Sequence, residues 1–488
     1  MLARKWWTLI LVCVAIFMLL LDITIVNVAL PNIGRELDAS FTDLQWVIDA
    51  YALTLATSVL NAGSLADLLG RKRVFLTGVA MFTAASALCG SATSPLFLNL
   101  ARGFQGVGGA IMFATSLALL SQEFHGRERG TAFGIWGATT GAAVAIGPLI
   151  GGALVTWLGW RWIFFVNLPI GVAALILGAA QLHESRDEEH GGVDVAGLLT
   201  LTGGLFALVL ALLRGNEWGW SSGRELALYA AAVVLLAGFV AAQSLQQRPM
   251  VELALFRSPA FAGAQVAAFA LSASSFSMFL YLTLYLQNVL GYSPIAAGVR
   301  FLPTTLLSFA IAPIAGKLSA QVPPRLLIGG GLGLVGLGLM LMHGVSVSAG
   351  WTTLLAGFLV NGVGIGLTNP PLASTAIGVV EPRRAGMASG ANSTFRQIGI
   401  ATGIAALGAL FQHHIQHGLH GAPATVVHAV ASGHVQAGGE AARAAFVGGL
   451  NEILLVAAGV AFAGALLSLA LIRSRDFARE PETVEAAA

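Results

Sequence analysis

The sequence predicts an all-α protein that crosses a membrane many times. Apolar residues make up 56% of its 488 residues and charged residues only 10%, whereas soluble domains are about half apolar and about a quarter charged. Apolar runs of about 20 residues, the length that spans a bilayer as a helix, recur along the chain with short polar breaks between them. This pattern excludes an ordinary soluble domain and predicts a polytopic membrane protein.

We count fourteen such runs and expect each to form one membrane-spanning helix. The first run follows Arg4 and Lys5, as in a signal peptide, but it is too long for one and no small-residue cleavage site closes it. We therefore expect it to remain as the first span. The expected spans are approximately residues 7–30, 46–68, 74–92, 96–120, 131–156, 161–181, 195–213, 226–243, 261–287, 295–316, 325–343, 351–376, 388–411 and 446–472.

Lysine and arginine residues are distributed unevenly over the breaks between these spans. With the N-terminus in the cytoplasm, the cytoplasmic breaks collect most of the cations, among them Arg71, Lys72 and Arg73, and the outer breaks keep few. This asymmetry orients membrane proteins, so we expect both termini on the cytoplasmic side of the cell membrane. The net charge of +2 forms no basic stripe, which argues against nucleic acid as a partner.

A repeat divides the chain into two halves. Glycine and arginine residues of spans four and five recur 256 positions later in spans twelve and thirteen. The pattern comprises Gly106, Gly108, Arg127 and Gly130 in the first half and Gly362, Gly364, Arg383 and Gly386 in the second. Duplicated units of six spans that rock around a midplane site are a common plan of transporters.

We therefore expect two bundles of six helices with two inserted central helices. The expected parts are an N-terminal bundle at 1–183, an insertion with cytoplasmic linkers at 184–257, a C-terminal bundle at 258–473 and a cytoplasmic tail at 474–488. The C-terminal bundle includes an outer, histidine-rich loop at 412–445.

The break between spans two and three reads GSLADLLGRKR. Gly63 permits close approach of helices, and Asp67 can pair with a cation or with the N-terminus of a neighbouring helix. We expect Gly63, Asp67, Gly70 and Arg71 to latch one conformation, whereas a plain positive-inside anchor would explain only the cations. The motif resembles the signature of the major facilitator superfamily. Ala320 occupies the repeat position of Asp67, so the second half lacks the acid.

Span five contains GAAVAIGPLIGG, which resembles the signature associated with antiporters of that superfamily. Its motif residues are Gly141, Gly147, Pro148, Gly151 and Gly152. Gly147 and Pro148 break helix regularity, and the small neighbours permit tight packing, so the segment would serve as a bending point. Ordinary small-residue packing is the alternative.

Three further segments narrow the resemblance. They read LDITIVNVALP in span one, WRWIFFVNLPIG in span six and LYLQNVLGYSPIAAG around the end of span nine. With fourteen spans, they resemble the drug:proton antiporter group, the quaternary-ammonium and multidrug efflux type. The resemblance implies a proton-coupled antiporter that exports lipophilic or cationic drugs or a secreted metabolite, without a cofactor and without enzyme activity. Export of lipids or fatty acids is the nearest alternative, and a passive channel or receptor is a remote one.

Charged residues within the expected spans are candidates for proton coupling, because each costs about 2.5–3.5 kcal/mol at the bilayer centre. Span geometry places Asp22, Asp49 and Arg102 in the outer half of the first bundle. Burial favours the protonated carboxyl group and a nearby arginine favours the carboxylate. We expect Asp22 to be the main proton site, Arg102 to modulate it, and Asp49 to assist or to select cationic cargo. A capping role near the interface is the alternative for Asp49.

We also expect a substrate cavity with an apolar, adaptable wall that suits lipophilic cargo. Its candidate residues are Asn27, Gln105, Phe276, Phe279, Tyr281, Tyr285 and Arg396. Core or lipid-facing packing explains the aromatic residues equally well, and Arg396 could instead bind backbone carbonyls. In the outer loop, a continued helix would align His413, His417 and His420 for a metal, but we expect a solvated loop without metal, in a monomeric protein.

Overall fold

The structure, a computed structural model, describes the chain in seven segments. These are residues 4–186, 194–246, 249–319, 321–381, 384–419, 423–431 and 439–473. Helices make up nearly all of them, and no strand occurs within these segments. Helices satisfy their own backbone hydrogen bonds, which is what a bilayer without water requires.

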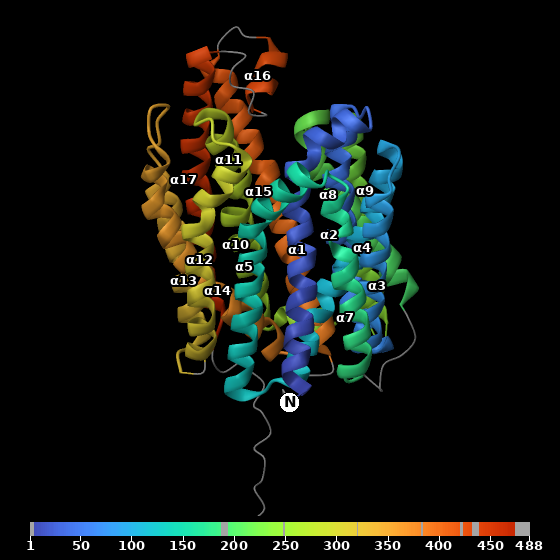
Figure 1. Cartoon of the computed structure of the whole chain (residues 1–488). Helices are drawn as coiled ribbons and strands as arrows, with labels where there is room; N and C mark the ends of the chain where they lie inside the picture. Colours follow the sequence, from blue (N-terminus) through green and yellow to red (C-terminus); the bar gives the residue numbers. More distant parts are fainter. Residues whose placement is uncertain are drawn as a thin grey trace, which may run out of the picture.

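The first bundle is built from antiparallel helices (Figure 1). They are α1 (Arg4–Glu36), α2 (Phe41–Leu69), α3 (Arg71–Gly90), α4 (Pro95–Glu123), α5 (Gly126–Trp157), α6 (Trp162–Phe165) and α7 (Asn167–Gln181). Local signals fix several ends. Ser40 and Asp43 form a capping box at the start of α2, and Ser94 with Pro95 begins α4.

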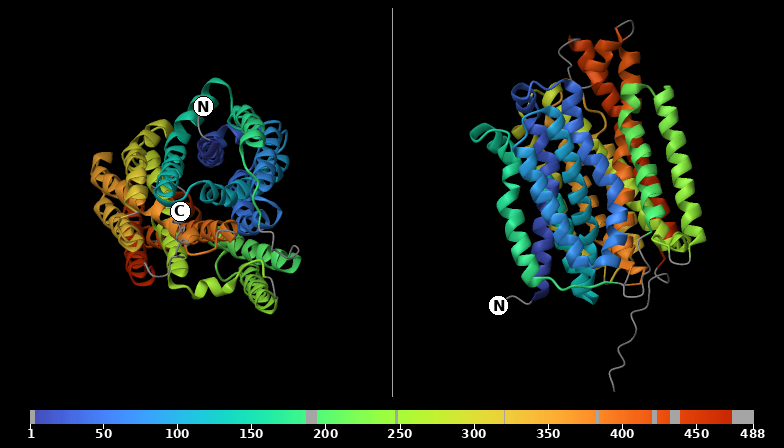
Figure 2. Two further views of the ribbon diagram at one scale, coloured as in Figure 1. Left: turned by 90° about the horizontal axis from the view of Figure 1, so that it is seen from below. Right: turned by 90° about the vertical axis from the view of Figure 1, so that its right-hand side faces the viewer.

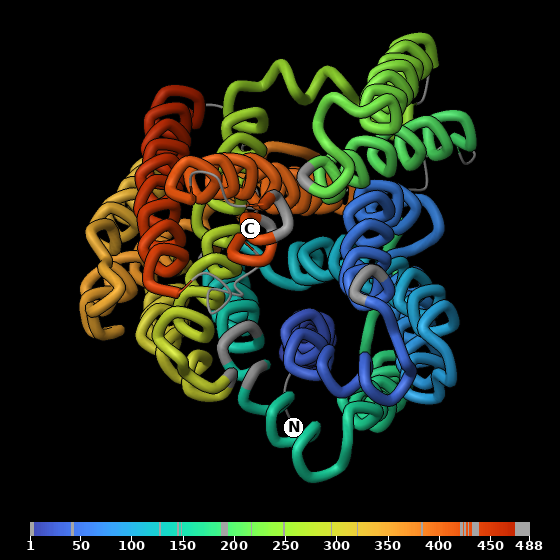
Figure 3. Tube along the Cα trace, turned by 90° about the horizontal axis from the view of Figure 1, so that it is seen from above, coloured from blue at the N-terminus to red at the C-terminus, as the bar shows by residue number. Residues whose placement is uncertain are grey.

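Two inserted helices, α8 (Val195–Trp218) and α9 (Gly223–Leu245), lie outside the bundles and pack through α8 against α2 and α15 (Figure 3). Asp194 caps α8 by accepting a hydrogen bond from the N–H of Gly197 at 2.8 Å. The same carboxylate accepts one from the side-chain amide of Gln243 in α9 at 2.5 Å. Asp194 therefore holds the inserted pair together as a hairpin.

The second bundle follows an entry turn, η1 (Leu253–Arg257). Its first span is made of α10 (Pro259–Leu271), the π-helical turn η2 (Ser272–Phe276), α11 (Ser277–Leu284) and the π-helical turn η3 (Tyr285–Val289). The others are α12 (Pro294–Leu318), α13 (Pro324–Met342), η4 (Trp351–Leu354) with α14 (Leu355–Gly378), α15 (Ala385–Gly418), the short α16 (Ala424–Ala431) and α17 (Gly439–Leu471).

Each bundle has its own hydrophobic core. The largest cluster of buried apolar side chains runs from Ala264 to Ile472 and lies wholly in the second bundle. A second cluster belongs almost entirely to the first bundle. The bundles meet where α5 packs on α12 and where α2 packs on α15 (Figure 3). Two bodies that each have their own core can move as units.

Within the described residues, thirteen helices are long and apolar enough to cross a membrane. The 32-residue helix α5, several of whose side chains are not described, is not among them. The count of fourteen spans therefore stays a prediction. α1 begins and α17 ends at the same end of the molecule, which lies at the bottom of Figure 1 and of the right-hand view in Figure 2. We name this end the basal end and the other the distal end.

The expected loop at 412–445 is largely helical. Helix α15 continues to Gly418, α16 covers Ala424–Ala431, and α17 already begins at Gly439. No proline or glycine interrupts the chain between residues 412 and 417, so the helix of span thirteen extends beyond the apolar run. His413 and His417 lie on this extension with their ring centroids 4.2 Å apart and their rings tilted by 54°.

His414 of α15 pairs with Glu452 of α17 at 2.6 Å. His420 and the side chain of His428 lie outside the described residues, as does His434. Among the residues that are described, no group of three or more histidine, cysteine or acidic side chains could hold a metal ion.

Candidate functional site

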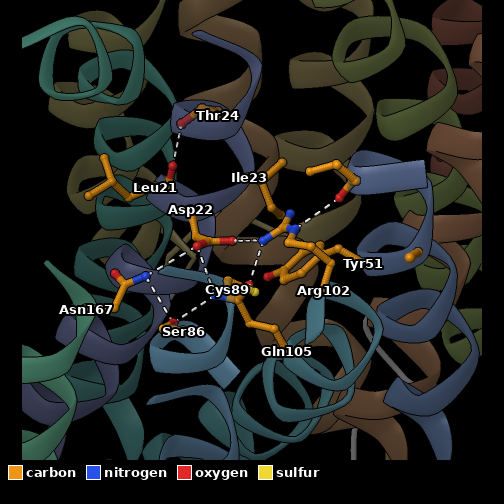
Figure 4. A network of polar contacts seen from close by, with 12 residues as sticks. Leu21, Asp22, Ile23, Thr24, Tyr51, Ser86, Cys89, Arg102, Gln105 and Asn167 are labelled. Atoms are coloured by element: carbon orange, nitrogen blue, oxygen red, sulfur yellow. Dashed lines mark hydrogen bonds and ion pairs between the residues drawn. The ribbon is translucent and has the colours of Figure 1, made fainter. Parts of the chain in front are cut away.

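A buried polar network surrounds Asp22 in the interior of the first bundle (Figure 4). Its carboxylate accepts a hydrogen bond from the Arg102 guanidinium of α4 at 2.5 Å, and this contact is also an ion pair. The side-chain amides of Gln105 and Asn167 donate to the other oxygen at 2.9 and 3.2 Å. Ser86 of α3 accepts from both amides. Side chains of four helices, α1, α3, α4 and α7, thus form the network around this carboxylate.

Arg102 is held on all sides. Besides Asp22, it donates to the side-chain oxygen of Gln105 at 2.7 Å and to the backbone carbonyl of Val47 at 3.0 Å. Its guanidinium lies 4.2 Å from the ring centroid of Tyr51, a distance at which the ring face attracts a cation. Asp22 and Arg102 are each only 1% exposed. An ion pair this deeply buried depends on its partners, because removing one leaves an uncompensated charge.

Asp49 does not join this network. Its carboxylate pairs at 3.0 Å with Arg214 of the inserted helix α8, and Arg214 also pairs with Glu217 and lies 4.6 Å from the ring of Trp46. Asp49 was expected to act in one group with Asp22. The structure instead places it outside that group, because an inserted helix supplies Asp49 with its own arginine. Arg214 follows the expected span at 195–213, and it lies within α8 because that helix continues to Trp218.

At the basal end, Asp67 joins the two bundles. Its carboxylate accepts hydrogen bonds from Arg71 at 3.0 and 2.9 Å. It also accepts from the backbone N–H groups of Gly386 and Met387, in the first turn of α15, at 3.0 and 2.8 Å. An anion at a helix N-terminus is favoured by the free N–H groups and by the helix dipole. Gly70 makes the turn between α2 and α3 with φ +108°, a conformation that side chains disfavour.

Paired glycines bring the bundles into backbone contact at this end. A Cβ at Gly63 of α2 would lie 2.2 Å from the carbonyl oxygen of Gly386 in α15. A Cβ at Gly130 of α5 would lie 2.1 Å from that of Gly316 in α12. Gly63 corresponds to Gly316 in the repeat, and Gly130 corresponds to Gly386, so the two contacts are related by the internal symmetry.

The glycines of span five lie between α1 and α12. A Cβ at Gly147 would meet Thr24 of α1 at 1.8 Å, and one at Gly151 would lie 3.2 Å from Cα of Ile25. A Cβ at Gly152 would meet Ile295 of α12 at 2.8 Å, whereas one at Gly141 would lie an ordinary 3.7 Å from Ser308. Helix α5 runs without interruption through this segment, rather than breaking at Gly147. The side chain of Pro148 lies outside the described residues.

The expected cavity residues separate into several places. Gln105 belongs to the Asp22 network and not to a cavity wall. Asn27 is exposed and donates to the carbonyl of Ile23 in its own helix. The hydroxyl groups of Tyr281 and Tyr285 donate to backbone carbonyls of the second bundle at 2.7 and 3.1 Å.

Phe276 and Phe279 are neighbours in the second bundle, with ring centroids 6.3 Å apart. Phe279 also lies against Phe301, with ring centroids 5.1 Å apart, and it lines a small cavity. That cavity lies inside the second bundle, among α11, α12, α13 and α14, and not between the two bundles. Arg396 donates to Asn369 of α14 and to Asn392 of its own helix.

Sequence reasoning missed several residues of the Asp22 network. Ser86, Asn167 and Tyr51 are buried polar side chains in apolar spans. Polar side chains are rare in such spans, and this was the signal that could have identified them. Asn167 lies within the WRWIFFVNLPIG segment, yet nothing in its spacing indicates that it faces α1. Arg214 likewise carried only its charge as a signal.

Comparisons with known proteins place the chain in a family. The model of the Major Facilitator Superfamily matches residues 12–404. Multidrug resistance protein Stp of Mycobacterium tuberculosis is 38% identical over 404 residues, covering 83% of this chain and 75% of that protein. The tetracenomycin C resistance and export protein of Streptomyces glaucescens is 36% identical over 408 residues, covering 83% and 76%.

The match to puromycin resistance protein pur8 of Streptomyces alboniger, at 35% identity, covers 98% of this chain and 93% of that protein. The crystal structure of the human organic anion transporter MFSD10 (TETRAN) matches with a TM-score of 0.65 at 14% identity, covering 96% and 100% of the two chains. At that identity the likeness concerns the fold alone. The chain therefore belongs to the Major Facilitator Superfamily, and it is a multi-pass membrane transporter rather than an enzyme.

Proposed function

We propose that the chain exports lipophilic small molecules, including antibiotics and other drugs, in exchange for protons, and that Asp22 carries the proton. The observation that carries this proposal is the Asp22–Arg102 ion pair, sealed within the first bundle at 2.5 Å. Protonation removes the charge of Asp22 and leaves Arg102 without its counterion. Since a buried charge must be paired, the two protonation states favour different arrangements of α1 and α4.

The drug part of the proposal is supported by three relatives that cover most of the chain. Their names describe multidrug resistance, tetracenomycin C resistance and export, and puromycin resistance. Each proton that enters through 100 mV supplies about 2.3 kcal/mol, which corresponds to roughly a fortyfold gradient of cargo. No cofactor enters the proposed cycle, and we assign it to a monomer.

In the proposed cycle the bundles 1–183 and 258–473 rock against each other. The basal end is the cytoplasmic end, because the positive-inside rule favours that orientation. The contact of Asp67 with the first turn of α15 and the two glycine pairs close this end in the described conformation. Gly63, Asp67, Gly70 and Arg71 thus act as a latch that must open for cargo to enter from the cytoplasm.

Helix α5 connects the proton site to the second bundle. Gly147 contacts Thr24, two residues after Asp22, and Gly152 on the same helix contacts Ile295 of α12. A shift of α1 on protonation would therefore be passed through α5 to the interface between the bundles. This coupling is the role that we assign to Gly141, Gly147, Pro148, Gly151 and Gly152. In the same cycle Asp49 anchors the inserted hairpin.

The experiment is dye efflux from cells that express the full chain, measured with ethidium and with fluorescein. Wild type should lower the accumulation of at least one dye, and a protonophore should abolish the effect. Asp22→Asn should abolish efflux at equal expression. Asp49→Asn is the matched control, since Asp49 is also a membrane carboxylate paired with a buried arginine, and it should retain efflux within a few-fold. Efflux by Asp22→Asn at the wild-type rate would refute the proton role of Asp22.

A further inference from the structure

A buried arginine in the second bundle has no acidic partner among the residues that the structure describes. Arg396 is 9% exposed, and a guanidinium stays charged in a protein. Its Nη2 atom has no hydrogen-bond partner within the part of the chain that the structure describes. The sequence from α10 to the end of α15 holds a single acid, Glu381, which precedes α15 by four residues and Arg396 by fifteen.

The groups around Arg396 are amides whose oxygen atoms are already used. Arg396 Nη1 donates to Oδ1 of Asn369 at 2.8 Å, and Nε donates to Oδ1 of Asn392 at 3.3 Å. Asn392 in turn donates to Oε1 of Gln265 in α10 at 3.5 Å. Gln265 is 1% exposed, and its Nε2 has no partner among the described residues. The cluster therefore ends in two donors, one of them charged, that no acceptor of the described residues reaches.

The position of this cluster is that of a transport site. Arg396 lies eleven residues into α15, about 16 Å from its basal end at 1.5 Å per residue. That is close to the middle of a hydrocarbon core of about 30 Å. Asn369 faces the first bundle, because its Cβ lies only 3.8 Å from the place of a Cβ at Gly137 of α5. The cluster thus borders the interface between the two bundles.

We infer that Arg396, with Asn369, Asn392 and Gln265, binds an acidic group of the cargo, so that the exported molecules are lipophilic organic anions. Buried donors without acceptors are costly, and a carboxylate, enolate or phenolate would satisfy both free donors and neutralise the arginine. A guanidinium offers paired N–H groups that match such oxygens. A cationic cargo would instead meet a like charge. This inference rests on the proposed export function and specifies its cargo.

This assignment places the proton site in the first bundle and the cargo site in the second. The first bundle holds an acid that is already paired with Arg102, and the second holds an arginine with no acid. Rocking that separates α5 from α14 would expose Arg396 across from Gly137, where α5 has no side chain. Proton and cargo sites would then lie in different bundles, and both would depend on α5.

The experiment measures equilibrium binding of two xanthene dyes to the purified full-length protein by fluorescence anisotropy. Fluorescein carries a carboxylate and a phenolate, whereas rhodamine 6G is an esterified cation with the same ring system. Wild type should bind fluorescein more tightly than rhodamine 6G. Arg396→Gln should weaken fluorescein binding by about tenfold or more, the equivalent of 1.4 kcal/mol, and leave rhodamine 6G binding unchanged or tighter. Arg396→Lys keeps the charge and should retain more affinity for fluorescein than Arg396→Gln does.

Arg300→Gln is the matched control, because Arg300 lies in the same bundle with its guanidinium over the rings of Tyr292 and Trp351. It should bind both dyes as wild type does. Gel filtration and thermal unfolding report whether each variant folds. Three results would overturn the inference. Arg396→Gln could bind fluorescein as tightly as wild type does, or the glutamine and lysine variants could lose affinity for both dyes equally. The third is a wild-type protein that binds rhodamine 6G more tightly than fluorescein. The inference is equally overturned if chloride at low concentration displaces all bound fluorescein.

Binding is measured without a proton gradient, so the two proposals can fail separately. If fluorescein binding requires Arg396 but protonophores do not affect efflux, proton coupling is refuted and the anion site is still supported. The opposite result would refute the anion site alone. In that case a protonophore abolishes ethidium efflux, Arg396→Gln leaves this efflux unchanged, and the protein does not bind fluorescein.

Discussion

The carboxylate of Asp67 accepts a hydrogen bond from the backbone N–H of Gly386 at 3.0 Å and so joins the first bundle to the second. This contact, with its neighbour at Met387, closes the basal end. Both are charge-assisted hydrogen bonds between two bundles that must separate during transport. Their strength therefore biases the equilibrium between the closed and open states.

Asp67→Ala should open the basal end. The variant loses two charge-assisted hydrogen bonds to α15. Loss of even one of them is worth about 1.5–3 kcal/mol, so the population should shift at least roughly ten- to hundredfold. Spin labels at Arg73 and Arg325, which are both exposed, would report a longer distance across this end. Glu128→Ala, which removes only the partly exposed ion pair with Lys5, should leave the distance unchanged. An unchanged distance in Asp67→Ala would mean that Asp67 does not hold the bundles together.

Gly130→Ala should impair transport by a different route. The new Cβ would lie 2.1 Å from the carbonyl oxygen of Gly316, and no side-chain rotation moves a Cβ away from a backbone atom. Overpacking of this kind costs about 1–3 kcal/mol, so dye efflux should fall roughly tenfold while each bundle keeps its own core. Gly330→Ala is the control, because nothing lies within 4 Å of its Cβ position. Equal efflux by both variants would contradict the tight glycine contact.

Gly147→Ala should disturb the proton site through Thr24. The added Cβ would meet the Thr24 hydroxyl at 1.8 Å, whereas only Cα, at 3.7 Å, remains near it once that side chain is removed. Efflux should therefore fall in Gly147→Ala and recover in the double variant with Thr24→Gly. Thr24→Gly alone should cost less than about 1 kcal/mol in helix propensity, since that value separates glycine from alanine and threonine lies between them. A double variant as impaired as Gly147→Ala would show that the two residues are not coupled, since contacting residues must deviate from additivity.

The fold was predictable because a bilayer leaves few solutions. Backbone groups must be satisfied within helices, so apolar runs translate directly into the helices of both bundles. The errors lie where helices leave the apolar region. Helix α15 runs to Gly418 and α8 to Trp218, since a span's hydropathy marks the membrane thickness and not the end of the helix.

The site was predictable only in part, for a physical reason. Asp22 stands out by its cost in an apolar span, and Arg102 is the nearest arginine that can offset it. Lateral neighbours carry no such signal. Asp49 finds its partner in Arg214, which follows 165 residues later in the chain, and the amide of Gln105 points to Asp22 rather than into a cavity.

Proton release on cargo binding tests the role of Asp22 most directly. Purified full-length protein in weakly buffered solution, with a pH indicator, receives a dye that it transports. If the protein exchanges cargo for protons, wild type should release a proton as the dye binds. Asp22→Asn should bind the dye and release none. Release by Asp22→Asn equal to that of wild type would contradict the account, because the proton would then come from another group.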